Sequence, residues 1–289
     1  MVARREVVAA PQATPARFGL LSVAQMPTDT GRWEGGILTM PNACGNGGSY
    51  GDPCPAPGDR EKADSAGVVI GGGDPFTVYA GFRCAPVGFT DDEIRERGDA
   101  ALLAGEERTV EEVFWTGVTD NAVEIHPHLA ENTASTPGVD DFTWLAATTV
   151  AGGGGAVSVR RALADLEREL AGCYGGQGVI HMPRDVATVA VAEGIVERYG
   201  NRLETKVGTL VAAGAGYPGT SPTGAAAAAG ESWVYATGAV QVRRSGVFYT
   251  GSIAESLDRV SNTIQRLAER TYVVTWDCCL LAARVGLEA

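Results

Sequence analysis

The sequence is poor in the residues and motifs on which many enzyme sites and nucleic-acid surfaces depend. Of its 23 basic residues only Lys62 and Lys206 are lysine, and 35 acidic residues bring the formal net charge to −12. This balance argues against a broad basic face of the kind that binds nucleic acid without regard to base sequence. The 289 residues also contain no H-E-x-x-H and no Walker loop. Composition and motifs therefore give no positive sign of an enzyme.

Long apolar runs are missing as well. No stretch approaches the ~18 apolar residues of a membrane-spanning helix, and residues 1–19 lack the apolar core of a signal peptide. The cysteines form no C-x-x-C pair; they are Cys44, Cys54, Cys84, Cys173, Cys278 and Cys279. We therefore expect no membrane association, and reduced thiols in a cytosolic setting. The adjacent Cys278 and Cys279 would point to opposite faces of a strand, which favours small apolar fillers over shared ligands.

One residue type is abundant: glycine, with 39 copies. This is about 13%, against roughly 7% in an average protein. Such an excess predicts many turns and loops. A length of 289 residues is enough for a large domain, or for two domains with cores of their own.

The clearest local signal is a long helix over 90–117. Thr90 and Glu93 form a capping box, and Gly117 suits the left-handed turn that ends a helix. An apolar stripe at helical spacing predicts one buried face; it contains Ile94, Ala101, Leu102, Val110, Val113 and Phe114. Gly98 and Gly105 each weaken the helix by ~1 kcal/mol. The other face of the helix is strongly acidic, since nine acidic and three arginine residues between Asp91 and Glu112 give a net charge of −6. We expect such a helix to be a support across which other elements lie, rather than a catalytic site.

Two β segments precede this helix, over 34–43 and 76–88, and they enclose a long tip rich in Gly, Pro, Asp and Ser. So long an irregular tip is unusual inside a compact domain, and we expect a hairpin that projects from the body. Residues 1–28 read as an arm, either disordered or extended on another surface.

The second half of the chain alternates between predicted helices and strands. A short strand is expected at 121–130, and four glycines, 152–155, predict a hinge. An amphipathic helix at 158–172 follows, then a strand, a proline and a second helix within 176–194. Segments 203–219, 231–249 and 262–287 are expected to be largely β.

Three groups of residues are candidate sites. Gly214, Gly216 and Gly219 spell G-x-G-x-x-G, but Pro218, Pro222 and Gly224 oppose the helix that a dinucleotide site requires. His181 lies in an apolar strand, where a hydrogen-bonded structural histidine is expected.

Glu124, His126 and His128 alternate, so on a strand they would share one face and could begin a metal site. No fourth ligand is identifiable nearby and Pro127 disturbs the strand, so a solvated face is the preferred interpretation. We expect no catalytic, cofactor or metal residue, and no cofactor.

From Leu163 onward the order of elements resembles the major capsid proteins of tailed bacteriophages, the Hong Kong 97-type fold that encapsulins share. The similar segments are LADLEREL followed by GVIHMPRDVATVA, then LETKVGTLVAAGAGYPG, ESWVYATGAVQVRRSG and NTIQRLAERTYVVTWDCCLLAARVGL. The N-terminal half agrees in architecture, with an arm, a projecting hairpin and a long helix ending in EEVFWTG. The resemblance covers nearly the whole chain, by element order and loose patterns.

The resemblance implies an α+β chain divided into five parts. These are an N-terminal arm, 1–28; a projecting β-hairpin or extended loop, 29–88; a peripheral domain with a spine helix, 89–150; an axial domain, 151–230; and return strands of the peripheral domain, 231–289.

The implied function is that of a non-enzymatic major capsid subunit, which assembles with itself into pentamers and hexamers of an icosahedral virion head. The shell would be assembled in the host cytoplasm, possess no membrane, and enclose double-stranded DNA without sequence-specific binding. Scaffolding, portal and decoration proteins are the further partners that the resemblance implies.

Two alternatives stay open: an encapsulin-type compartment shell, and a metal-dependent enzyme using Glu124, His126 and His128. In some members of the family that the chain resembles, the subunits of the shell are cross-linked by an isopeptide bond between a hairpin lysine and a peripheral-domain asparagine. Lys62 and Asn262 are the residues that such a bond would join in this chain.

Overall fold

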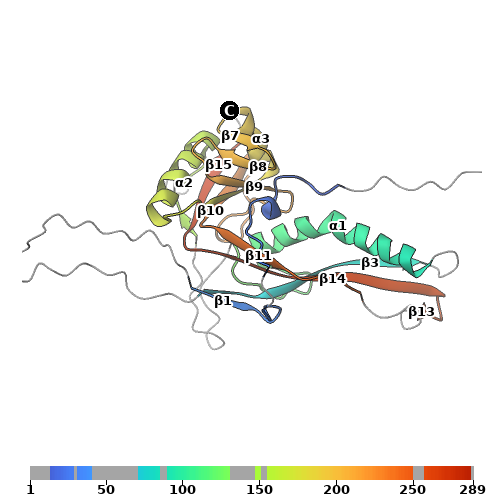
Figure 1. Ribbon diagram of the computed structural model, residues 1–289. Helices are drawn as coiled ribbons and strands as arrows, with labels where there is room; N and C mark the ends of the chain where they lie inside the picture. Colours follow the sequence, from blue (N-terminus) through green and yellow to red (C-terminus); the bar gives the residue numbers. More distant parts are fainter. Residues whose placement is uncertain are drawn as a thin grey trace, which may run out of the picture.

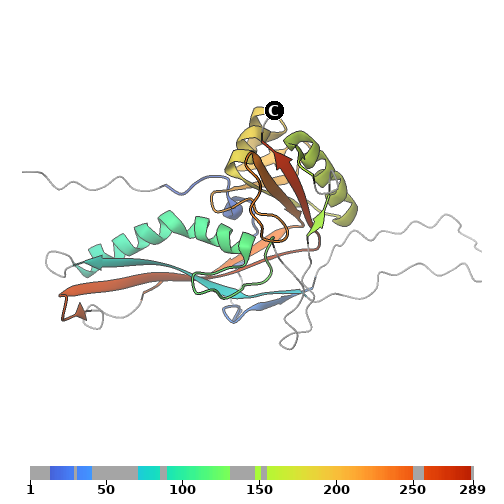
Figure 2. The ribbon, with the colours of Figure 1, turned by 180° about the vertical axis from the view of Figure 1, so that it is seen from behind.

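The computed structural model of the chain describes residues 14–28, 31–40, 71–84, 90–130, 147–150, 155–249 and 257–287. Figures 1 and 2 show two parts: a long ribbon of strands with the helix α1 alongside it, and a second unit that contains α2 and α3. Within the described residues, no helix combines the length and the apolarity that crossing a bilayer requires.

The helices and strands follow the expected order. The helices are η1 (Leu20–Ser22), α1 (Asp91–Thr116), α2 (Val159–Cys173) and α3 (Arg184–Ala192). The strands of the ribbon and its surroundings are β1 (Ile37–Thr39), β2 (Gly71–Gly73), β3 (Pro75–Cys84), β11 (Val240–Arg244), β12 (Phe248–Tyr249), β13 (Leu257–Asp258) and β14 (Thr263–Trp276). The strands of the second unit are β4 (Thr148–Thr149), β5 (Val157–Ser158), β6 (Val179–Pro183), β7 (Val196–Tyr199), β8 (Arg202–Thr205), β9 (Leu210–Gly214), β10 (Glu231–Thr237) and β15 (Leu280–Gly286).

α1 is the helix that the local signals predict. The Thr90 side chain accepts a hydrogen bond from the backbone of Glu93, whose carboxylate accepts one from the Thr90 backbone, and Gly117 ends the helix at φ 71°. Its 26 residues correspond to about 39 Å at 1.5 Å per residue. The predicted stripe is buried except for Ala101, which is exposed. The acidic face is not wholly exposed, because Glu106 and Glu111 are buried.

The ribbon is built around β14. It pairs antiparallel with β3 over ten positions, from Ile264 opposite Cys84 to Val273 opposite Pro75, and it also pairs with β11, β12 and β13. Ile264, Arg266, Ala268 and Tyr272 are buried at even positions, as expected where one face of a strand packs against a helix. The two predicted β segments around the hairpin are thus present. However, β1 pairs with β2, whereas β3 pairs with β14.

The second unit contains a sheet whose central strands, β6, β9, β10 and β15, are buried on both faces. In the described part of the chain its order is β4-β15-β10-β6-β9-β8-β7, with β5 also pairing with β15. In β6, Ile180 and Met182 join the core beneath α2 and α3, whereas Val179 joins the core around α1. The strands β9, β10 and β15 divide their side chains between the same two cores. This two-sided burial explains why these strands read as apolar runs.

The arm packs on its own chain within its described residues, 14–28. Leu20 and Val23 are buried, and Gln25 exchanges backbone hydrogen bonds with β11 through Val240 and Val242. The strand predicted at 121–130 is wrong: these residues form an irregular loop that returns along the end of α1, with an isolated bridge from Val118 to Glu124. Its course is set by backbone bonds, for example from Ala130 N to the Trp115 carbonyl at 2.8 Å.

Two glycines give a matched test of how α1 is held. A β-carbon at Gly216 would overlap the carbonyl oxygen of Arg108 in α1, whereas one at Gly105 would meet nothing within 4 Å. We expect Gly216→Ala to destabilise the chain by about 1–3 kcal/mol, because the loop must move off the helix. Gly105→Ala should instead stabilise it by about 0.5–1 kcal/mol. Thermal or urea unfolding of both variants measures the difference, and equal effects of the two changes would contradict this packing.

Candidate functional site: the surfaces around α1

α1 is anchored to the ribbon through a buried carboxylate. Glu106 is 4% exposed, and Arg270 Nη1 donates to its two oxygens at 3.0 and 3.2 Å. The Tyr272 hydroxyl donates to Oε2 at 3.0 Å. Burial is the main reason that the pKa of Tyr272 rises to about 12. The charge of Glu106 is thus matched by a cation and a hydroxyl, as a buried carboxylate requires.

A second buried carboxylate joins three separate segments. Glu111 is 1% exposed and accepts a hydrogen bond at 2.9 Å from Leu20 N of the arm. Its other oxygen accepts one at 2.9 Å from Gly216 N, in the loop after β9. Burial raises the pKa of Glu111 above its usual value, against the lowering effect of these backbone donors. We call the contact among Leu20, Glu111 and Gly216 the junction.

Aromatic rings complete the packing beside the junction. Trp115, at the end of α1, is fully buried, with ring centroids 4.9 Å from Tyr217 and 4.8 Å from Tyr235. Its indole Nε1 donates to Thr220 Oγ1 at 2.9 Å. The C-terminal residues of α1, EEVFWT, therefore connect the ribbon to the second unit through this packing and hydrogen bond.

This packing accounts for the glycine motif. Gly216 lies against α1, Gly219 has φ 70°, and β-carbons at Gly214 and Gly219 would overlap Tyr217 and Ser232 respectively. The residues after β9 form a loop, as the prolines in this segment predict. The close approach of the backbone to α1 is thus enough to explain why glycines occur at these positions of the G-x-G-x-x-G motif.

His181 is a structural residue, as predicted. It is fully buried, with Nδ1 3.2 Å from the Tyr217 hydroxyl and Nε2 3.0 Å from Thr237 Oγ1. Desolvation lowers the pKa of its imidazole to about 3, so the ring is neutral.

The prediction of reduced cysteines is wrong for Cys173, Cys278 and Cys279, all of which are disulfide-bonded. Cys173, at the end of α2, forms a disulfide with Cys279, and Cys278 and Cys279 lie in the turn between β14 and β15. No spacing signal predicts this bond, because its partners are 106 residues apart. Lys62 lies outside the described residues and Asn262 is exposed just before β14, so the isopeptide bond stays a prediction.

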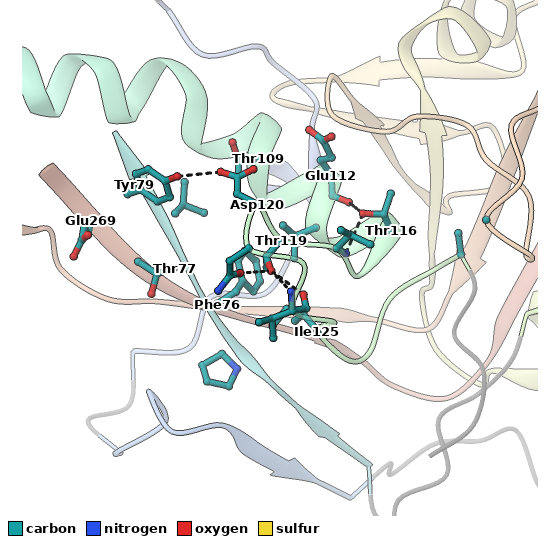
Figure 3. Close-up of a pocket in the computed structure, with 18 of the residues that line it drawn as sticks. Phe76, Thr77, Tyr79, Thr109, Glu112, Thr116, Thr119, Asp120, Ile125 and Glu269 are labelled. Atoms are coloured by element: carbon teal, nitrogen blue, oxygen red, sulfur yellow. Dashed lines mark hydrogen bonds between the residues drawn. The ribbon is translucent and has the colours of Figure 1, made fainter. Parts of the chain in front are cut away.

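A groove of about 1100 Å³ opens beside the end of α1 (Figure 3). β3 and the loop 118–125 line it together with α1, and the Tyr79 hydroxyl donates to Asp120 Oδ2 across it at 3.2 Å. Threonines are frequent in its lining, and Glu112, Asp120 and Glu269 give it three carboxylates. Such a groove suits an extended, basic peptide segment better than a small apolar ligand.

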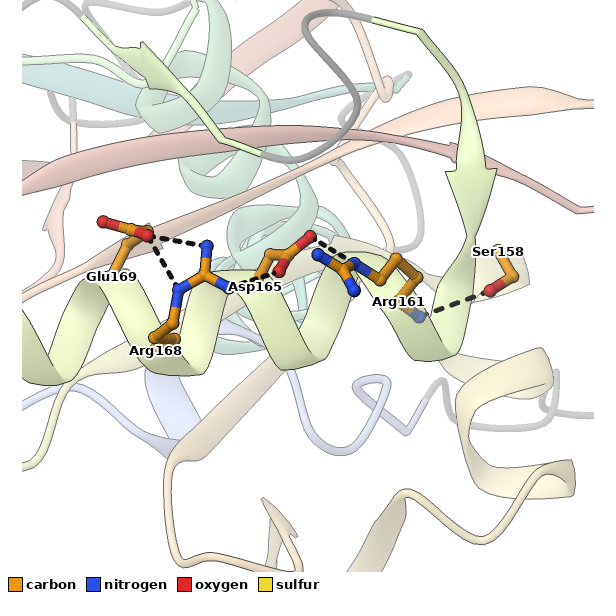
Figure 4. Close-up of polar contacts among 5 residues, drawn as sticks. All are labelled: Ser158, Arg161, Asp165, Arg168 and Glu169. Atoms are coloured by element: carbon orange, nitrogen blue, oxygen red, sulfur yellow. Dashed lines mark hydrogen bonds and ion pairs between the residues drawn. The ribbon is translucent and has the colours of Figure 1, made fainter.

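An ordered group of charges lies on α2 (Figure 4). Asp165 is buried and accepts from Arg161 Nε at 2.7 Å and from Arg168 Nη1 at 3.0 Å. Both arginine side chains remain over 60% exposed, at 64% and 63%. Arg168 also donates to Glu169 Oε1 from Nε at 2.9 Å and from Nη2 at 2.8 Å, so the two arginines are matched by two carboxylates and the group carries no net charge.

The three alternating residues do come together. Glu124 Oε1 is 3.7 Å from His126 Nε2 and 4.0 Å from His128 Nε2. Both histidines are buried, whereas Glu124 is exposed. The expectation of a wholly solvated face is therefore wrong for the histidines, and a loop rather than a strand brings the three residues together.

The fold is that of proteins that form capsid shells. No protein-family model and no curated protein matches the sequence. Among solved structures, the capsid of a native GTA particle has a TM-score of 0.60 at 10% identity, covering 99% of this chain and 95% of that one.

Two further structures share this fold. The capsid of Ralstonia phage GP4 gives a TM-score of 0.52 at 10% identity, covering 99% of this chain and 96% of that one. The holo-SrpI encapsulin complex from Synechococcus elongatus PCC 7942 gives 0.53 at 11% identity, covering 100% and 98%. The α+β, Hong Kong 97-type fold expected from the sequence is therefore confirmed.

Glu107, which lies one helical turn before Glu111 on α1, predicts a dependence of stability on pH. Burial, aided by the charge of Glu111, raises the pKa of Glu107 from 4.5 to about 7. A raised carboxyl pKa means that the folded state binds the proton more tightly than the unfolded state, so Glu107 costs stability as the pH rises from about 4.5 through 7. We expect Glu107→Gln to raise the melting temperature at pH 8 and to change it little at pH 4.5.

The control for this prediction is Glu112→Gln, an exposed glutamate on the same helix. It should show no such difference between the two pH values. Thermal unfolding at both pH values measures the effect. A Glu107→Gln chain that is destabilised equally at pH 4.5 and pH 8 would contradict a raised pKa at Glu107.

Proposed function

We propose that the protein is a major capsid subunit, which assembles with copies of itself into the closed icosahedral head of a tailed bacteriophage. The observation that carries this proposal is a fold shared along 99% of the chain with the capsids of a GTA particle and a Ralstonia phage. The protein acts through its surfaces and not as an enzyme.

The shape of the chain supports assembly with copies of itself. α1 lies along one face of the β3–β14 ribbon, and Thr77, Tyr79 and Gly81 on the alternate positions of β3 are exposed. Exposed large apolar side chains also lie at the root of the hairpin, where Leu38 is 69% and Met40 65% exposed. Exposed apolar surface of this kind is typical of a surface that another chain covers. In a shell, repeated heterologous contacts around symmetry axes provide that cover.

The segments best suited to bridge subunits are the hairpin tip and the arm. An isolated two-stranded ribbon is marginally stable in water, so the hairpin gains stability by lying across a neighbour's α1 and peripheral strands. The carboxylates of the groove are complementary to Arg4 and Arg5 of a neighbour's arm. Each exposed ion pair contributes only ~0–1 kcal/mol, but a shell repeats each of them many times.

We propose a place in the shell for each segment of the chain. The hairpin tip and the start of the arm reach neighbours, whereas residues 14–28 of the arm pack on their own chain. The ribbon around β14, together with α1, forms the peripheral domain. The second unit forms the axial domain around a symmetry axis. Its sheet includes β10 and β15 as well as the strands within 151–230, so the proposed axial domain takes in these two strands too.

The proposed setting is a virion assembled in the host cytoplasm. The acidic chain encloses DNA without binding a particular base sequence, since its net charge of −12 repels phosphate. Scaffolding, portal and decoration proteins are further proposed partners, each able to use surfaces that the shell leaves open.

The competing proposal is an encapsulin-type compartment, because the holo-SrpI encapsulin has the same fold. The long predicted hairpin and the proline-containing arm favour the viral head. The contents of purified particles discriminate between the two: double-stranded DNA supports a virion, and a packaged enzyme supports a compartment. Size-exclusion chromatography with light scattering tests both, since a chain that remains a monomer or dimer under all assembly conditions contradicts either shell.

The hairpin tip offers a direct test of assembly. Replacing residues 45–70 by a short turn should leave β1 and β2 paired and the subunit folded. Because the proposed clasp between subunits is removed, we expect unchanged far-ultraviolet circular dichroism and loss of the particle peak in light scattering.

A control variant carries the same residues 45–70 in scrambled order, and so separates the loss of length from the loss of specific contacts. It should also fail to close stable shells. If the shortened chain forms particles of undiminished thermal stability, the hairpin does not hold the subunits together.

A further inference from the structure

We propose that Glu124, His126 and His128 bind a divalent transition-metal ion, zinc by preference, which fixes the loop 117–130 at the root of the projecting hairpin. One ligand atom from each of the three residues lies within 4.8 Å of the others. The role is structural, and it is separate from the proposal of a capsid subunit.

The spacing of these atoms is close to that of a zinc site. Ligands about 2.1 Å from a tetrahedral ion lie about 3.4 Å from one another. Here Glu124 Oε1 is 3.7 Å from His126 Nε2 and 4.0 Å from His128 Nε2. Small side-chain rotations, chiefly of the exposed Glu124, would bring the set to bonding distance.

The ring of His128 is already oriented for metal binding. Its Nδ1 is 2.8 Å from the carbonyl oxygen of Ile125, which makes Nδ1 the protonated nitrogen and directs the Nε2 lone pair towards Glu124. Metal-binding histidines are characteristically held in this way, with the second ring nitrogen donating to a carbonyl or carboxylate. Gly117 makes room for the ring, since a β-carbon there would overlap it.

His126 is held through its backbone. Its N–H donates to Asp74 Oδ2 at 2.9 Å, and its carbonyl accepts from Asp74 N at 2.8 Å. Asp74 stands between β2 and β3, where the hairpin leaves the ribbon. The two imidazole rings lie 5.1 Å apart between centroids. An ion bound here would therefore tie the hairpin root to the loop that forms one wall of the groove.

The donor set selects the class of ion. Two imidazole nitrogens and one carboxylate oxygen suit zinc and its neighbours among the first-row metals, whereas magnesium and calcium prefer oxygen ligands alone. The Glu124 side chain is 58% exposed, so water or a group from a neighbouring subunit can complete four-coordination.

Metal content and thermal stability test the site. The full-length chain, stripped with EDTA, is incubated with zinc chloride, gel-filtered and analysed for zinc by mass spectrometry. We expect about one zinc ion per chain, and a melting temperature that zinc raises and magnesium does not, because an ion that binds only the folded state stabilises it.

Glu124→Gln is the informative variant, because an exposed side chain can change without loss of fold. It should bind zinc at least roughly tenfold more weakly and lose the thermal shift. Glu96→Gln, the same change at an exposed site on α1 outside the groove, should behave as the unaltered chain. Absence of stoichiometric zinc would overturn the proposal, and Glu124, His126 and His128 would then interact only as a carboxylate with two imidazoles. Equal zinc retention by Glu124→Gln would overturn it too, since the ion would then bind elsewhere, for example at cysteine.

Discussion

Burial of carboxylates along α1 is the constraint on which the rest of the structure depends. A helix with a net charge of −6 over residues 91–112 would be expected to stay in water, yet Glu106 and Glu111 are almost fully buried. Each is tolerated because donors reach it from other segments: an arginine and a tyrosine of β14 at Glu106, and two backbone amides at Glu111. Removing such partners would leave a buried charge uncompensated, which is far more costly than losing a surface ion pair.

One part of the molecule covers its apolar surface within the subunit, whereas another part leaves apolar side chains exposed. The central strands of the second unit's sheet are buried on both faces, beneath α2 and α3 on one side and against α1 on the other. The far end of the ribbon has α1 on one face, and the hairpin root exposes Leu38 and Met40. Apolar burial contributes roughly 25 cal/mol per Å², so covering such surface with a neighbouring subunit is a substantial source of stability. The proposed shell supplies that cover without any catalytic site.

How far the sequence predicts this fold depends on whether the deciding interactions are local. Thr90, Glu93 and Gly117 lie within the helix ends they define, so α1 is predictable with its caps, and the 3.6-residue period of α2 is equally clear. The burial of Glu111 cannot be predicted from the sequence, because its hydrogen-bond donors Leu20 and Gly216 are 91 and 105 residues away along the chain.

The candidate metal site shows the same limit. The alternating spacing of Glu124, His126 and His128 predicts that the three side chains lie together. In the structure a loop held by Asp74, and not a strand, brings them together, and the local sequence pattern does not indicate this contact. The Cys173–Cys279 disulfide likewise joins distant segments.

The central claim is that the ribbon and its hairpin are completed by neighbouring copies of the same chain. Cryo-electron microscopy of the purified particles, at a resolution that traces each subunit, tests it most directly. We predict a closed icosahedral shell in which residues 45–70 of one subunit lie across α1 and the peripheral strands of the next. A shell in which these residues fold back on their own subunit, leaving the neighbour's α1 uncovered, would contradict it.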